Sequence, residues 1–213
     1  MFDKPQSRWG TLTRGSGDCS AGSSGWVNPG MADSANGNRA TFMEACLTQD
    51  FLDQNEGSDT DVRKVAPPGY RWAGRTARHH GLTPRENINA CHLLAKELSG
   101  DGKDLRNLST CARGANAAQT GSTQGVNHMY TYEAQVKKAV AAGQTVYYRV
   151  TPDYKGNRTV AWQYRIQASG TNPDGSAGIS ISAQAPNELI NGRNLGMSVD
   201  PTTKQPVPLA GMN

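Results

Sequence analysis

The chain has 213 residues, of which 36% are hydrophobic, and it contains 24 glycines and 11 prolines. This length suffices for one domain with a sizeable core, and the many turn-forming residues indicate short elements on a loop-rich scaffold. No run of about 18 apolar residues occurs, which argues against a transmembrane helix, and the polar start MFDKPQSRWG lacks the apolar core of a signal peptide.

The net charge of +4 is unevenly distributed along the chain. Residues 1–60 carry 4 Lys or Arg and 8 Asp or Glu, residues 61–170 carry 16 and 7, and residues 171–213 carry 2 and 3. The middle segment therefore has a net charge of +9. An excess of this size attracts polyanions, because neutralising phosphates releases their counterions, although a solvated basic surface has the same composition.

The four cysteines, Cys19, Cys46, Cys91 and Cys111, form no CxxC pair, which argues against a zinc ribbon. They are too few for a disulfide scaffold. One or two disulfides are compatible with an oxidising compartment, and the spacing alone does not give their pairing.

Residues 1–38 are rich in Gly, Ser and Asn and predict a loose arm, with Trp9 and Trp26 as anchoring points. Residues 39–213 are then expected to form a single domain. In its first segment, ATFMEACLTQDFLDQN, Phe42, Cys46 and either Gln49 or Asp50 lie at helical spacing, which predicts a short helix.

The middle of the chain predicts a helix from Tyr70 to His80, ended by Gly81, and then a β-hairpin. The hairpin consists of the runs NINACHLLA and LRNLST, joined by the turn SGDGKD. Next, CARGANAAQ favours a short helix and MYTYEAQVKKAVAAG a longer one that ends at Gly143. The runs TVYYRVTPDY, TVAWQYRIQASG and GISISAQAPN predict antiparallel strands. The predicted fold class is α+β, with a central antiparallel sheet and peripheral helices.

The segment from Asn89 to Glu133 holds the side chains that suggest chemistry. His92 lies on the first hairpin strand, and Arg113 and Asn116 are three residues apart, so they share a face of the helix that follows. A histidine can activate water, an amide oxygen can bind Mg²⁺, and an arginine can stabilise charge that develops on a phosphate. The composition thus permits metal-dependent phosphodiester hydrolysis.

The motifs CHLLAKELSGDGKDLRNLSTCARGAN and MYTYEAQVKKAVAAGQTVYYRVTPDYKG resemble the DNA/RNA non-specific endonuclease family. That family has a ββα-metal, or His-Me finger, core, which the resemblance places at about residues 87–142. Its pattern is similar to Asp-Arg-Gly-His, an Asn-Leu pair, a helix asparagine, a Met-x-x-Tyr-Glu helix and a Val-x-Tyr-x-Val-Thr-Pro-x-Tyr strand. The resemblance covers roughly residues 87–170 and follows the order of the family motifs.

The resemblance implies a role for each matching residue. His92 would be the general base, and Asn116 the one direct protein ligand of Mg²⁺, with Mn²⁺ or another divalent ion as a substitute. Glu133 would hold water at the ion. Asn89 stands where the family has a second acid and would help to order that water.

The sequence departs from the family pattern where Asp-Arg-Gly is replaced by Asn89-Ala90-Cys91. The motif arginine is therefore absent, and Arg113 is the best substitute by helical geometry, with Arg106, Arg85 and Arg78 behind it. The stretch AAQTGSTQGVNH is also long and predicts an inserted loop beside the site. His128 borders this loop and is a candidate for substrate contact, as are Arg106 and Arg85.

Structural roles are the alternative for several of these residues. His92 could be a packed strand histidine, Asn116 an ordinary polar helix residue, and Glu133 the partner of Lys137 in an i,i+4 ion pair. Cys91 should point away from the face that His92 occupies, because successive strand residues alternate. It would then be a buried thiol or the disulfide partner of Cys46 or Cys111.

The sequence as a whole predicts a metal-dependent endonuclease that hydrolyses DNA, with RNA as a second substrate and little sequence preference. Such an activity would endanger its producer, so we expect secretion or delivery as an antibacterial effector toxin, with a cognate inhibitor (immunity) protein. A weakened nuclease-like protein that binds nucleic acid or a protein partner without cutting is the alternative. A structural or adhesive secreted domain is a third hypothesis, which predicts no metal near Asn116.

Overall fold

The computed structural model describes residues 19–122 and 124–199. The described chain is mixed α+β and is built on a five-stranded antiparallel sheet in the order β1-β2-β5-β6-β7. Its strands are β1 (Trp26–Pro29), β2 (Met43–Leu47), β5 (Thr145–Asp153), β6 (Gln163–Thr171) and β7 (Ala177–Pro186). The predicted fold class is confirmed.

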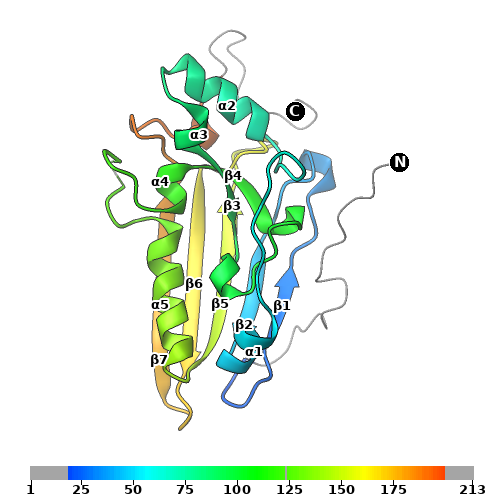
Figure 1. Cartoon of the computed structure of the whole chain (residues 1–213), viewed down its shortest axis with the longest axis vertical. Helices are drawn as coiled ribbons and strands as arrows, with labels where there is room; N and C mark the ends of the chain where they lie inside the picture. Colours follow the sequence, from blue (N-terminus) through cyan, green and yellow to red (C-terminus); the bar gives the residue numbers. More distant parts are fainter. Residues whose placement is uncertain (1–18, 123, 200–213) are drawn as a thin grey trace.

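The chain leaves this sheet after β2 and returns to it at β5. The intervening segment holds the two-stranded sheet of β3 (Ile88–His92) and β4 (Leu108–Ala112). It also holds the helices α1 (Gln49–Gln54), α2 (Tyr70–His79), α3 (Pro84–Asn87), α4 (Arg113–Asn116) and α5 (Met129–Ala141). Figure 1 shows α5 and the β3–β4 hairpin on the same face of the large sheet.

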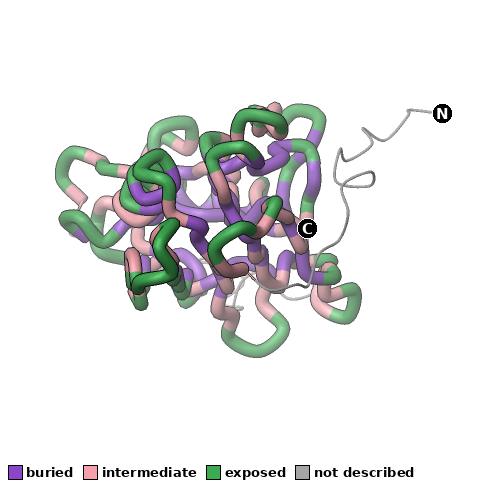
Figure 2. The backbone as a smooth tube through the Cα atoms, turned by 90° about the horizontal axis from the view of Figure 1, so that it is seen from below, coloured by how far each residue is buried: buried purple, intermediate pink, exposed green. Residues whose placement is uncertain are grey.

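The inner face of the sheet forms the main core against α5 and the hairpin. Along β5, Val146, Tyr148 and Val150 are fully buried, whereas the alternate residues are half-buried on the opposite face. A smaller core beneath α2 contains Trp72, Ile88, Leu189 and Leu195. In Figure 2 the buried residues run along the middle of the molecule, and exposed turns surround them.

Two predictions for the start of the chain are corrected. Residues 26–29, which were placed in a loose arm, form edge strand β1, and Trp26 faces Cys46 on β2. Residues 43–47, predicted as helix, are strand β2, and only 49–54 are helical. The helical spacing was misleading because Cys46, which is bonded to Cys19, is buried between the buried residues Ala45 and Leu47. It therefore interrupts the alternation of buried and half-buried residues that is typical of a strand. Trp9 lies outside the described residues.

The other predicted elements agree with the structure within a few residues. Three 3-10 turns lie among them: η3 (Lys96–Leu98), η4 (Leu105–Asn107) and η5 (Leu195–Met197). A further turn, η2 (Ser34–Asn36), precedes β2. Among the described helices, none is both long enough and apolar enough to cross a membrane.

Candidate active site

The site is built on the β3–β4 hairpin and on α4, which follows β4 without a linker. The strands pair antiparallel, with His92 opposite Leu108 and Asn89 opposite Cys111. His92 is the last residue of β3, and Asn116 is the last residue of α4. The order strand, strand, helix is that of the predicted ββα unit.

A disulfide joins Cys91 and Cys111 across the hairpin. Both cysteines belong to the main core, so the face that carries them packs toward the large sheet. His92 directly follows Cys91 and therefore leaves β3 on the opposite face, as predicted. The disulfide thus fixes the strand that ends in His92 to the strand from which α4 begins.

A second segment, residues 57–60, packs against the long hairpin turn. The Ser58 N–H donates to Gly100 O at 2.9 Å, and the Gly102 N–H donates to Ser58 O at 3.2 Å. A Cβ on Gly57 would lie 2.1 Å from Lys96 O, and one on Gly100 would lie 1.7 Å from Leu94 O. Gly57 is therefore required by the close approach of the two segments, and Gly100 by the tight fold of the turn itself.

This packing brings a carbonyl to the imidazole of His92. Nε2 lies 3.2 Å from Ser58 O and 3.4 Å from the Thr60 hydroxyl. A carbonyl oxygen only accepts, so Nε2 must carry the hydrogen, and in the neutral ring Nδ1 keeps the lone pair. Backbone geometry thus selects the tautomer in which Nδ1 can act as a base.

Burial lowers the pKa of His92 below the usual histidine value. The Ser58 carbonyl and the carboxylates of Glu97, Asp59 and Asp101 act in the opposite direction but are outweighed. At neutral pH the imidazole is therefore mainly neutral, with its one hydrogen on Nε2. This is the form that a general base requires.

Helix α4 presents Arg113 at its first residue and Asn116 at its last. Arg113 is exposed and Asn116 is half-buried, and α4 packs against both hairpin strands. Within residues 19–122 and 124–199, no group of three or more His, Cys, Asp or Glu side chains could hold a metal ion. The amide oxygen of Asn116 nevertheless fits Mg²⁺, which takes oxygen ligands and keeps several waters when the protein supplies few.

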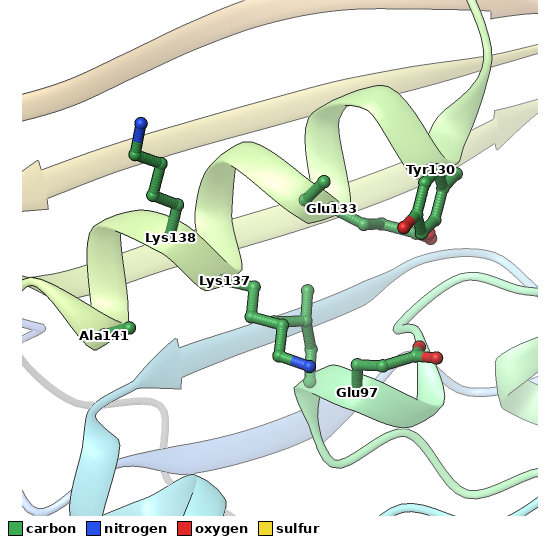
Figure 3. Close-up of a pocket in the computed structure, with 8 residues that line it drawn as sticks. Glu97, Tyr130, Glu133, Lys137, Lys138 and Ala141 are labelled. Atoms are coloured by element: carbon green, nitrogen blue, oxygen red, sulfur yellow. The ribbon is translucent and has the colours of Figure 1, made fainter.

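Glu133 lines a pocket of about 410 Å³ between α5 and η3, the α5 pocket. Figure 3 shows Glu133 extending toward Tyr130, with Glu97 across the pocket on η3. Burial, helped by the charge of Glu97, raises the pKa of Glu133 to about 8. Within the described residues no ion pair forms between Glu133 and Lys137, so the structural alternative of an i,i+4 bridge lacks support.

Asn89 lies on β3 two residues from Cys91 and is half-buried. It shares the strand face of Cys91, opposite that of His92. Ala90 leaves β3 on the same face as His92, where the family pattern has an arginine. Both residues border a groove that also contains Arg85 on α3.

The other residues predicted to contact substrate differ in exposure and in whether their side chains already have partners. Arg106 is half-buried and donates from Nε to Asp104 at 3.0 Å, so its charge is largely matched. Arg85 and Arg78 are exposed. His128 is the N-cap of α5, where Nδ1 accepts from the Thr131 N–H at 3.3 Å, and only 6% of the residue is exposed. This capping role was not predicted.

Sequence reasoning also missed Ser58, Thr60 and Glu97. Ser58 and Thr60 lie 34 and 32 residues before His92, in a segment without periodicity, and Ser58 acts through its backbone carbonyl. No side-chain pattern marks such a contact. Gly102 in the turn was the available signal, because it allows the backbone of Ser58 and Asp59 to approach closely.

Comparisons with known proteins agree with this geometry. A family model described as DNA/RNA non-specific endonuclease matches residues 36–172. NucA from Streptococcus agalactiae, solved with a magnesium ion bound, has a similar fold, with a TM-score of 0.56, 18% identity, and coverage of 84% of this chain and 81% of that one. No curated protein sequence matches the chain.

Two further solved structures have the same fold. The Sda1 nuclease with a bound zinc ion gives a TM-score of 0.56 at 16% identity, over 85% of this chain and 81% of that one. A protein described as an extracellular endonuclease gives 0.54 at 22% identity, over 80% and 86%. At these identities the likeness establishes the fold alone.

Proposed function

The chain belongs to the DNA/RNA non-specific endonuclease family, and we propose that it is a metal-dependent endonuclease that hydrolyses DNA, with RNA as a second substrate. The observation that carries the proposal is the hydrogen bond from His92 Nε2 to Ser58 O. This bond leaves Nδ1 unprotonated at the end of a ββα hairpin. A catalytic base needs this combination of position, tautomer and lowered pKa.

In the proposed reaction, His92 Nδ1 removes a proton from the attacking water. Arg113, on the same helical face as Asn116, neutralises the phosphate. Asn116 would hold a divalent ion by its amide oxygen, and Glu133 would order the water around it. Asn89 leaves β3 on the face opposite His92, so its side chain is not assigned to this water. The ion would supply Lewis-acid stabilisation of the charge that develops on the phosphate.

Mg²⁺ is the proposed ion, with Mn²⁺ or another divalent ion as a substitute. The oxygen donors of Asn116 and Glu133 support a hard cation. The magnesium in the similar NucA structure and the zinc in the Sda1 structure support a divalent one. Contacts mainly to the sugar-phosphate backbone would explain little sequence preference.

An extracellular site of action is also proposed. Two disulfides, Cys19–Cys46 and Cys91–Cys111, suit an oxidising compartment. Similar solved structures are described as an extracellular endonuclease and an extracellular nuclease. The proposed role is that of an antibacterial effector toxin. A cognate inhibitor protein would protect the producing cell from it.

Incubation of the purified protein with supercoiled plasmid and Mg²⁺, with and without EDTA, tests the activity. We expect cleavage that EDTA abolishes and that His92→Ala reduces by about 10²–10⁴-fold, the contribution of a general base. The exposed His79→Ala variant is the matched control and should retain activity. Intact plasmid with shifted mobility across several divalent metals would instead support the alternative of a binding protein that does not cut.

A further inference from the structure

A groove of about 940 Å³ lies beside the start of β3, where Ile88, Asn89 and Ala90 line it. We call it the Ala90 groove; its lining includes Thr60, Arg63, Tyr70, Gly74, Arg85 and Ala90. Its walls come from three places: the segment after Ser58, helix α2, and the turn from α3 into β3. Figure 1 shows α2 and α3 next to the end of the hairpin from which β3 starts.

The groove lies close to His92, on the Nε2 side of the ring. Thr60 lines it and also lies 3.4 Å from His92 Nε2. Ala90 precedes His92 by two residues, so both side chains leave β3 on the same face. A substrate strand whose phosphate is at Nδ1 would therefore pass along the imidazole to reach the groove, on the same face of the hairpin.

Two arginines from different elements flank the groove. The Arg63 side chain is 87% exposed, and its Nε and Nη2 donate to Asp61 at 2.9 and 3.0 Å. These bonds orient the guanidinium while leaving Nη1 for a phosphate oxygen. Arg85 is exposed on α3. With Asp61 as the one acidic lining residue, the charged groups at the groove sum to a net +1.

The shape of the groove also suits a chain-like ligand. Its volume is at the upper end of the roughly 300–1,000 Å³ of small-molecule pockets. Ala90 and Gly74 project little or nothing into it, and Tyr70 offers an aromatic ring on which a base can stack. A polyanionic strand, with phosphates and flat bases in alternation, matches this lining.

We infer that the Ala90 groove binds the substrate strand on one side of the scissile phosphate, with Arg63 and Arg85 each contacting a backbone phosphate. The inference rests on the proposed nuclease function and extends it to the substrate-binding surface. It assigns a substrate-binding role to two arginines of the basic segment, residues 61–170. It also accounts for the small residue at position 90, because a long side chain there would fill the groove.

The test measures the salt dependence of DNA binding for the full chain in EDTA, using fluorescence anisotropy with a labelled 20-base-pair duplex. Each phosphate contact contributes about 0.9 to the slope of log affinity against log salt. The Arg63→Ala/Arg85→Ala variant should therefore lower that slope by about 2, and at 0.15 M salt it should weaken binding about fivefold per lost contact. An Arg75→Ala/Arg193→Ala variant removes two exposed arginines outside the groove and is the control.

A second variant, Gly74→Leu, blocks the groove without changing its charge. Gly74 lies within α2, and the neighbour found within 4 Å of an added Cβ is Pro84 Cβ at 3.7 Å, so the backbone tolerates a side chain. In Mg²⁺ this variant should raise KM for plasmid DNA with a smaller change in kcat and no fall in Tm, because leucine favours a helix interior more than glycine does.

The outcomes separate the inference from the proposed function. A wild-type protein that does not cleave plasmid contradicts the proposed function. A wild-type protein that cleaves, with equal slopes for the groove and control variants or an unchanged KM for Gly74→Leu, contradicts the inference alone. A slope lowered only by the groove variant, together with a raised KM for Gly74→Leu, supports it.

Discussion

The five-stranded sheet and the β3–β4 hairpin are stabilised in different ways. The sheet is held by burial of apolar and aromatic side chains, among them Tyr148, Tyr164 and Ile166, against α5. A two-stranded hairpin is at best marginally stable in water. The hairpin therefore depends on specific cross-links and hydrogen bonds to the rest of the molecule.

Two buried asparagines provide many of those hydrogen bonds. Asn107 accepts from the Leu94 N–H at 2.8 Å and donates to Leu94 O and Asp101 O, which closes the hairpin turn. Asn187, the residue after β7, accepts from the Ala112 N–H at 2.7 Å and donates to Ala161 O at 2.7 Å, which joins the end of β4 to the segment between β5 and β6.

The two parts also differ in what they position. The sheet contributes apolar side chains to the main core, whereas the hairpin carries His92 and leads into α4. Changes to the polar contacts of the hairpin should therefore reduce activity more than comparable changes to the sheet. The following predictions test this comparison, from the largest effect to the smallest.

Replacing Asn107 by Leu should destabilise the protein by about 3–5 kcal/mol, because it removes the side-chain hydrogen bonds to the buried N–H and carbonyl of Leu94 and to the carbonyl of Asp101. Tyr148→Phe is the control in the sheet. Its buried hydroxyl has no hydrogen-bond partner among the described residues, so the change should cost less than about 1 kcal/mol. Urea unfolding measures the free energy of unfolding of both variants. Similar losses would contradict the claim that the hairpin depends on specific hydrogen bonds and the sheet on apolar burial.

Removing each disulfide should cost a similar amount of stability. The loops closed by Cys91–Cys111 and Cys19–Cys46 span 20 and 27 residues, and the chain-entropy model gives about 3 kcal/mol for each. Only the Cys91→Ser/Cys111→Ser variant should lose activity at a temperature where both variants are folded, because that bridge joins the strands before His92 and α4. Plasmid cleavage and thermal unfolding are the measurements; equal activity of the two variants would count against this role.

Glu133→Gln should stabilise the metal-free protein increasingly as the pH rises. In the folded state the carboxyl keeps its proton up to about pH 8, whereas an unfolded glutamate releases it near its ordinary pKa of 4.5. Wild-type stability therefore falls between these pH values relative to the glutamine variant. Because water reaches the half-buried carboxyl, we expect only about 1–2 kcal/mol, or a few degrees in Tm, between pH 4 and pH 8 in EDTA. A pH-independent difference in Tm would contradict the raised pKa.

Much of the fold could be predicted from local patterns. The hairpin, α5 and strands β5 to β7 have clear periodicity and turn residues, and the structure confirms them. Strand β1 has four residues within a Gly- and Ser-rich stretch, so its pairing with β2 decides its conformation. In β2, the buried Cys46 obscured the alternation of Met43, Ala45 and Leu47.

The candidate site was predictable where it depends on residue type and order, and not where it depends on distant backbone. His92, Asn116 and Glu133 follow from motif spacing, although their roles stay predictions. The carbonyl of Ser58, which selects the tautomer of His92, is brought close only by the packing of Gly57 against the hairpin turn. Likewise, the Ala90 groove joins residues 60–63 to α2 and α3, a proximity that no local pattern encodes.

A crystal structure of the protein soaked with Mn²⁺, with the ion located by its anomalous signal, tests the central claim most directly. The account predicts an ion bound by the amide oxygen of Asn116, with His92 Nδ1 facing a water beside it and Nε2 still bonded to Ser58 O. An ion bound only elsewhere, such as between Glu97 and Glu133 in the α5 pocket, or an imidazole with Nδ1 turned toward Ser58, would contradict it.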